Sequence, residues 1–169
     1  MTDYKLPFDS IENDFLRLDY LTTVGPRIVG LYVRGVEGNL LASTPEVHWE
    51  TPHGEYYLRG GHRLWCAPEN SFYMCPEDNL EVINNGDEVI LRGQIELSGL
   101  QKEISFHLDQ NCVRLQHKLT WQGNKSVELA PWAITQLRLG GMAILPLPVG
   151  SSLLPDRNFV LWPYSQIRD

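Results

Sequence analysis

The chain has 169 residues and is acidic, with 14 lysines and arginines against 21 aspartates and glutamates, a formal net charge of −7. This length predicts a single domain over residues 1–169, large enough to bury a core without disulfide or metal crosslinks. Hydrophobic residues make up 43% of the chain, which excludes an intrinsically disordered protein. The acidic balance excludes broad nucleic-acid and anionic-membrane surfaces, because both need clustered lysine and arginine. Neutral and cationic ligands are not excluded by the charge.

The sequence carries no signal for export or for membrane insertion. No stretch approaches the roughly 18–20 apolar residues that span a bilayer, and residues 1–15 contain acidic side chains and no apolar segment of the secretory type.

The cysteines, Cys66, Cys75 and Cys112, form no CxxC pair. We expect reduced thiols that act as small hydrophobic residues; a partial metal site with Cys66, Cys75 and a histidine is disfavoured, because the gap fits no common zinc spacing. The prediction is a cytoplasmic protein with no cofactor and no metal site.

Alternation of apolar and polar residues predicts short strands along most of the chain. The first expected elements, in chain order, are a helical turn in residues 9–15, a strand over 27–33 and an irregular stretch over 43–79. A turn at 84–87 and a strand over 88–97 follow, and then a hairpin whose strands, 103–108 and 113–121, are joined by a turn at 109–111. After a turn at 122–125 we expect a strand through Val127 and Leu129. Many short strands with turns at close spacing are typical of an antiparallel sandwich or barrel. The predicted fold class is all-β, an antiparallel β-sandwich.

The irregular stretch over residues 43–79 is rich in proline, glycine and aromatic residues. Aromatic density argues against disorder, and a long irregular stretch in a compact domain is usually functional. We therefore expect an ordered loop region that carries the site. His48 and His53 in this stretch flank Trp49 without a third metal ligand, and we interpret them as ordinary loop histidines.

The densest group of chemically useful residues is Gly60-Gly61-His62-Arg63-Leu64-Trp65, followed by Glu69. The glycines allow a positive φ or close backbone approach. An arginine beside His62 should keep the imidazole neutral, which suits hydrogen bonding to a hydroxyl or general acid–base work with Glu69. Trp65 could present a flat apolar surface to a sugar ring. The alternative is a structural turn in which Arg63 pairs with Glu69 and Trp65 packs in the core.

Further candidates lie on predicted strands. Trp132 and Gln136 share a face with Ile134, and this face either lines a cleft or packs in the core. His117 is in phase with Leu115 and Leu119, so we expect a buried or half-buried histidine satisfied by a neighbour. His107 faces the other way.

Four segments together resemble the galactose mutarotase-like group, which includes the aldose 1-epimerases. These are residues 25–31, residues 39–42, the Gly-Gly-His-Arg-Leu-Trp string at 60–65 and the Ala-Pro-Glu at 67–69, within a resemblance from about Phe15 to Pro148. The string at 60–65 is closer to other members of the group than to the true epimerases. The resemblance implies a β-supersandwich with a carbohydrate cleft on its concave face, in which His62 matches the group's first histidine. Together with the residues singled out above, it predicts a site for a small-molecule carbohydrate, with His62 and Glu69 as catalytic candidates and Arg63, Trp65, Trp132 and Gln136 as substrate-binding residues.

Two departures from the group count against ordinary mutarotation. The position of the group's catalytic acid falls at or beside Ala130, which cannot transfer a proton, and the position of its base would fall beyond Asp169. The aromatic-rich segment at residues 160–169 also suggests an incomplete, N-terminal portion of the sandwich, with an open sheet edge that favours a homo-oligomer. The leading hypothesis is thus carbohydrate binding. The alternatives are a sugar-active isomerase or epimerase that uses His62 with Glu69 or Glu128, and a non-catalytic assembly module.

Overall fold

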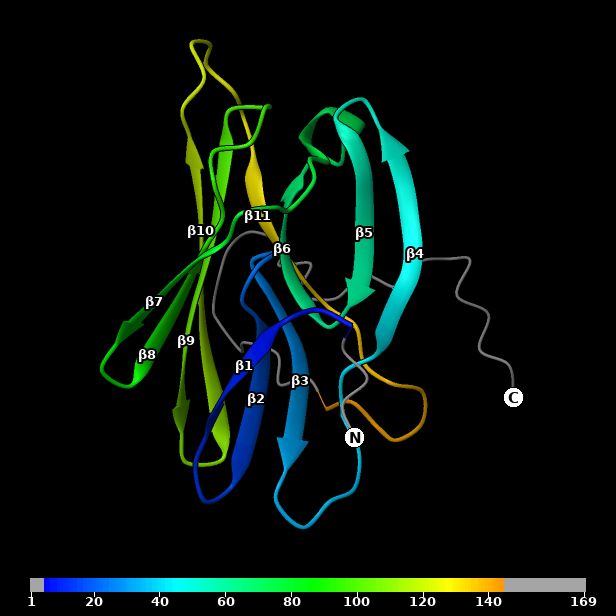
Figure 1. Cartoon of the computed structure of the whole chain (residues 1–169), viewed down its shortest axis with the longest axis vertical. Helices are drawn as coiled ribbons and strands as arrows, with labels where there is room; N and C mark the ends of the chain where they lie inside the picture. The colour runs from blue at the N-terminus through cyan, green and yellow to red at the C-terminus, as the bar shows by residue number, and fades with distance from the viewer. Residues whose placement is uncertain (1–4, 145–169) are drawn as a thin grey trace, which may run out of the picture. The chain divides into compact units, whose positions relative to one another are not determined.

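The computed structural model describes residues 5–144, and within them the protein is built from strands. The elements are β1 (Phe8–Glu12), β2 (Leu16–Leu21), β3 (Arg27–Val33), β4 (Ser43–Thr51), β5 (Gly54–Gly60), β6 (His62–Ala67), the 3₁₀ turn η1 (Ser71–Tyr73), β7 (Glu81–Asn85), β8 (Glu88–Arg92), β9 (Leu100–Asp109), β10 (Cys112–Trp121) and β11 (Ala130–Thr135). Figure 1 shows them in colour order along the chain.

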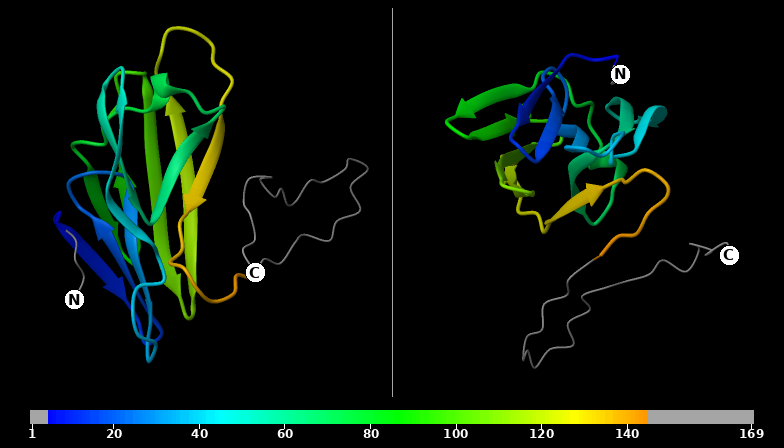
Figure 2. Two further views of the ribbon diagram at one scale, coloured as in Figure 1. Left: turned by 90° about the vertical axis from the view of Figure 1, so that its right-hand side faces the viewer. Right: turned by 90° about the horizontal axis from the view of Figure 1, so that it is seen from below.

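The strands form two sheets and a separate hairpin, and every strand pair is antiparallel. The five-stranded sheet has the order β1-β2-β3-β6-β11, and the four-stranded sheet has the order β10-β9-β8-β7. The β4–β5 hairpin lies on one side of the five-stranded sheet and the four-stranded sheet on the other (Figures 1 and 2). The predicted all-β, antiparallel fold class is therefore confirmed.

The main core fills the space between the two sheets. Its members are the inward-pointing apolar residues of both sheets and one residue of a connecting loop: Leu18, Tyr20, Ile28, Leu41, Leu64, Val89, Leu91, Ile104 and Phe106. The rings of Tyr20 and Phe106 meet edge to face at 5.3 Å, an arrangement that aromatic pairs prefer. This contact joins β2 to β9 across the core. We call the face of the five-stranded sheet toward this core the inner face, and the opposite face, toward the β4–β5 hairpin, the outer face.

A buried ion pair attaches the hairpin to the outer face. Arg27 at the start of β3 is fully buried and pairs with Glu77, whose side chain is 5% exposed. The same guanidinium donates to the backbone oxygen of Leu58 in β5 at 2.7 Å, and the Tyr56 hydroxyl donates to Glu77 at 3.0 Å. Burial disfavours the charge on each partner, but the attraction between them outweighs it, so the pKa of Arg27 is raised and that of Glu77 is lowered.

Several predicted elements are confirmed. The strand at residues 27–33 is β3, the hairpin around 109–111 is β9–β10, and the turn before β8 is centred on Gly86 and Asp87. The strand expected over 88–97 is present but ends at Arg92.

Other expectations are wrong. The helical turn in residues 9–15 is replaced by β1, and the strand through Val127 and Leu129 is replaced by β11, which begins at Ala130. The irregular stretch at 43–79 instead holds β4, β5 and β6. Both faces of β6 are buried and both faces of β4 are largely exposed, so neither strand shows the alternation of a half-buried strand. Residues 160–169 lie outside the described residues.

The buried ion pair gives the first prediction. Glu77→Gln should lower the free energy of unfolding by about 3–5 kcal/mol, because it leaves the charge of Arg27 buried and uncompensated. Urea unfolding of the full chain measures this loss. In the control, Glu12→Gln, the loss should be much smaller, because the Arg34–Glu12 pair is more than half exposed.

The double variant Arg27→Met with Glu77→Leu should recover most of the loss caused by Glu77→Gln, because neither charge of this pair is then left buried without its partner. A Glu77→Gln protein as stable as wild type would contradict the role assigned to the ion pair.

Candidate functional site

The site residues in β6 are positioned by the Gly60–Gly61 pair that precedes the strand. Both glycines have positive φ, 77° and 69°. A Cβ on Gly61 would lie 2.1 Å from the backbone oxygen of Ile28, so no other residue fits there. The backbone oxygen of Gly61 also accepts a hydrogen bond from the backbone N–H of Gln136, with a donor–acceptor distance of 2.8 Å. The two glycines therefore allow β6 to take its place in the sheet between β3 and β11, with the Gln136 backbone hydrogen-bonded beside the start of β6.

Strand alternation then divides the predicted site between two faces of the sheet. His62 and Leu64 point inward, toward the core between the sheets, whereas Arg63 and Trp65 point to the outer face. The sequence prediction grouped His62, Arg63 and Trp65 in one site. The structure does not bring His62 together with the other two.

The four predicted substrate-binding residues do lie together, on the outer face. Trp132 in β11 is the register partner of Trp65, and Ile134 is the partner of Arg63. The Nη1 of Arg63 donates to Oε1 of Gln136 at 2.9 Å, and its guanidinium carbon lies 5.0 Å from the centre of the Trp65 ring. We call Arg63, Trp65, Trp132 and Gln136 the arginine–tryptophan face.

The four residues differ in how much surface they present. Trp65 is 3% exposed and packs edge to face on Tyr56 at 5.0 Å, as the core alternative for this residue required. Arg63 is 6% exposed, and burial lowers its pKa. Trp132 and Gln136 are half-buried and form the accessible part.

Arg63 has no carboxylate partner among the described residues. Its guanidinium donates to the neutral side-chain amide of Gln136 and lies over the indole of Trp65, and its buried Nε has no hydrogen-bond partner. The predicted ion pair with Glu69 does not form: Glu69 is exposed in the loop after β6 and acts on Arg63 only as a minor charge that raises its pKa. Arg63 is thus a buried cation held by an amide and an aromatic ring.

The other predicted catalytic residue, His62, is hydrogen-bonded across the core to His117 in β10. The two Nε2 atoms are 2.7 Å apart, and Nδ1 of His62 lies 2.7 Å from Oγ1 of Thr135. One imidazole must donate and the other accept at the shared contact, so the pair needs at least one neutral ring. Neither Glu69 nor Glu128, both exposed, bonds to His62 within residues 5–144.

His62 is neutral at pH 7, as expected, but the cause differs from the expected one. Burial lowers its pKa to about 4, with smaller contributions from His117 and from Arg27; Arg63 is not among the causes. Burial also lowers the pKa of His117. The expectation that His117 is half-buried and satisfied by a neighbour is correct, but its partner is the histidine that was assigned to another site.

The remaining histidines and cysteines have ordinary environments. His107 is exposed, the His48 ring lies 5.2 Å from that of Tyr57, and Nε2 of His53 lies 3.0 Å from the backbone oxygen of Phe72. The cysteines are free; burial raises the pKa of Cys66 and of Cys75. Among the described residues, no group of three or more acidic, histidine or cysteine side chains is arranged to hold a metal ion.

The histidine pair gives a pH prediction. In the unfolded chain His62 binds a proton near pH 6.5, whereas in the folded protein it does so only near pH 4, so unfolding takes up a proton between these values. The stability contribution of the neutral ring is therefore complete above about pH 6.5 and is lost as the pH falls toward 4, by up to about 3 kcal/mol.

His62→Gln should flatten this part of the curve of unfolding free energy against pH, measured by urea denaturation from pH 4 to 8. His107→Gln, a change at an exposed histidine, serves as the control and should keep the wild-type slope. Equal slopes for wild type and His62→Gln would contradict the buried, neutral state of His62.

Comparisons with known proteins leave the family open. No protein-family model, curated protein or solved structure matches the chain. No helix in the described part of the chain is long and apolar enough to span a bilayer. The likeness to the galactose mutarotase-like group stays a prediction from sequence motifs.

Proposed function

We propose that the protein binds a carbohydrate on the arginine–tryptophan face. The observation that carries the proposal is the fixed hydrogen bond between Arg63 and Gln136 beside the half-buried indole of Trp132. A sugar presents hydroxyl groups at its edge and an apolar ring face, so it needs a polar group and a flat apolar surface side by side.

The polar half of this arrangement is Gln136. Its Oε1 accepts a hydrogen bond from Arg63, which orients the side-chain amide. The two N–H donors of Nε2 then remain for a ligand hydroxyl. Arg63 itself is too buried to offer more than the edge of its head group, so we assign it to positioning Gln136. An oriented amide costs little to order when a ligand binds.

The aromatic half is Trp132, supported by two further tryptophans. Trp132 lies beside Trp65 in the sheet register, and the Trp65 ring meets the ring of Trp49, from β4, edge to face at 6.4 Å. Trp49 is 41% exposed. Packing of a sugar ring on Trp132 would bury apolar area of both partners.

Catalysis is not part of the proposal. The residues considered for acid–base work are separated, since His62 points into the core and Glu69 lies exposed in a loop. His62→Ala is therefore expected to lower stability without removing the ligand contacts, whereas the sequence alone suggested a loss of binding.

Calorimetric titration with neutral mono- and disaccharides tests the proposal. Trp132→Ala should weaken binding roughly ten- to a hundred-fold through lost apolar contact, and Gln136→Ala should weaken it by a similar factor through a lost hydrogen bond. Gln116→Ala, which removes an exposed glutamine from β10, is the matched control and should bind as wild type does.

Urea unfolding of each variant separates lost binding from lost structure. Saccharide binding that survives both Trp132→Ala and Gln136→Ala in folded protein would remove this face from the site. No binding of any saccharide by wild type would reject the carbohydrate function.

A further inference from the structure

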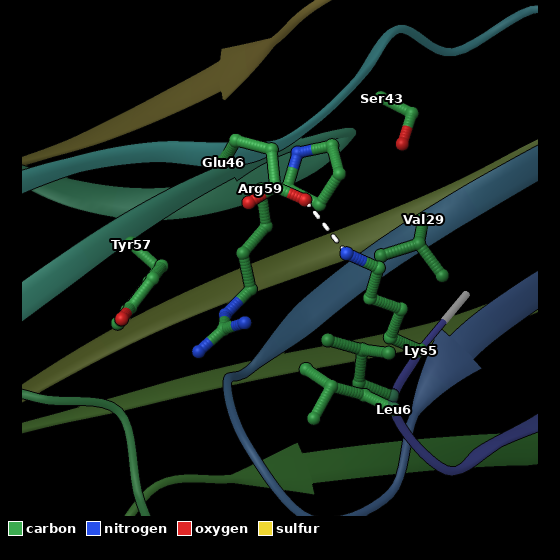
Figure 3. Close-up of a pocket in the computed structure, with 9 residues that line it drawn as sticks. Lys5, Leu6, Val29, Ser43, Glu46, Tyr57 and Arg59 are labelled. Carbon is green, nitrogen blue, oxygen red and sulfur yellow. Dashed lines mark hydrogen bonds and ion pairs between the residues drawn. The ribbon is translucent and has the colours of Figure 1, made fainter. Parts of the chain in front are cut away.

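A second candidate site lies where the N-terminal segment, β2, β3 and the β4–β5 hairpin line a hollow of about 230 Å³. It is smaller than the roughly 300–1,000 Å³ of sites for drug-sized ligands, so its size suits a small molecule. Its lining residues are Lys5, Leu6, Leu21, Val29, Ser43, Pro45, Glu46, Tyr57 and Arg59. Figure 3 shows the Arg59 guanidinium directed into the space between Tyr57 and Leu6.

Arg59 is held in an unusual backbone conformation at this hollow. Its φ is +56°, in the left-handed region that side-chain-bearing residues seldom adopt, and it is paired with Thr44 where the β4–β5 register shifts. Strained residues and β-bulges both gather next to functional sites. The conformation places the side chain over the Tyr57 ring, with the guanidinium carbon 4.8 Å from the ring centre.

The guanidinium of Arg59 makes no hydrogen bond within residues 5–144, and its Nε is shielded from solvent without a partner. Burial lowers its pKa. A guanidinium carries five N–H donors in a fork that matches a carboxylate, so an unsatisfied one at a hollow is a ready anion contact.

The other two charged residues that line the hollow are paired with each other. Lys5 pairs with Glu46 at 2.8 Å, as the dashed line in Figure 3 marks. Glu77, the buried carboxylate whose charge acts on Arg59, is hydrogen-bonded to Arg27 and Tyr56. Arg59 and Tyr57 also line a second hollow together with Glu55, Glu77 and Asp78, but Arg59 forms no ion pair with these carboxylates within residues 5–144, and Glu55 accepts from the Tyr57 hydroxyl. Arg59 therefore supplies the unmatched positive charge at the first hollow.

The rest of the lining is apolar. Leu21 and Val29 are buried residues of the five-stranded sheet that form its floor, and Leu6 and Pro45 complete the apolar wall. An inorganic anion would gain nothing from these contacts, whereas a compact apolar group would.

We propose that this hollow binds a small organic monocarboxylate, with the carboxylate on Arg59 and a compact apolar body against Leu6, Leu21 and Val29. The proposal is independent of the carbohydrate proposal, because none of its residues belongs to the arginine–tryptophan face.

Benzoate is the probe, and its neutral isostere benzamide is the first control. In titrations followed by calorimetry and by methyl NMR of the full chain, benzoate should bind saturably in the millimolar range or tighter and shift the methyl signals of Leu6, Leu21 and Val29. Benzamide should bind about tenfold more weakly or worse, because it cannot form the charged fork. Inorganic phosphate should also bind more weakly than benzoate.

Arg59→Asn tests the contact in the protein itself, since asparagine tolerates a positive φ. It should weaken benzoate at least about tenfold, whereas Arg34→Asn, which removes an exposed arginine paired with Glu12, should leave affinity unchanged. Arg59→Lys keeps the charge but loses the fork and should bind with intermediate affinity.

Benzamide or phosphate binding as tight as benzoate binding in wild type would overturn the proposal without any variant. So would unchanged benzoate affinity in folded Arg59→Asn, or an absence of benzoate binding by wild type. Saccharide titrations on Arg59→Asn should match wild type, so failure of one proposal can be told from failure of the other.

Discussion

The buried ion pair between Arg27 and Glu77 is the contact on which the outer half of this structure depends. Apart from the ion pair and its hydrogen bonds to Leu58 and Tyr56, the β4–β5 hairpin meets the five-stranded sheet through the ring contacts of Tyr56 and Trp49 with Trp65 and through the backbone bonds around Gly60 and Gly61. A buried pair costs desolvation on both sides and gives little net stability, but breaking it is expensive. Such a pair therefore fixes one arrangement of hairpin and sheet. The arginine–tryptophan face and the hollow at Arg59 both depend on that arrangement.

A second constraint is the alternation of side chains along β6, which places consecutive residues of the string at 60–65 on opposite faces of the sheet. His62 enters the core and meets His117, whereas Arg63 on the next residue reaches the outer face and meets Gln136. Adjacent residues of a strand cannot converge on one ligand from the same side. A motif that looks like one site in sequence is here a structural histidine pair on one face and a candidate binding surface on the other.

Alternation of apolar and polar residues made one pair of strands predictable, although β3, whose first four residues are all buried, was also expected from the sequence. β9 and β10 alternate cleanly and are joined by a turn, so their pairing followed from local signals. β6 is buried on both faces and β4 is exposed on both, so neither carries that signal. Trp132 and Gln136 could be placed together because they share a strand period. The His62–His117 contact could not, since it joins two sheets across 55 residues and no spacing encodes it.

The environments of three arginines at the outer face underlie the two proposed binding sites of this acidic protein. Arg27 takes the one buried carboxylate nearby, Glu77. Arg63 and Arg59 are instead placed over the rings of Trp65 and Tyr57. A ring face stabilises a cation without occupying its hydrogen-bond donors, unlike a carboxylate. Arg63 uses a donor to orient Gln136 toward the surface, whereas Arg59 keeps its donors and faces a hollow with an apolar floor. The first arrangement suits a neutral ligand with hydroxyl groups, and the second suits an anion with a small apolar body.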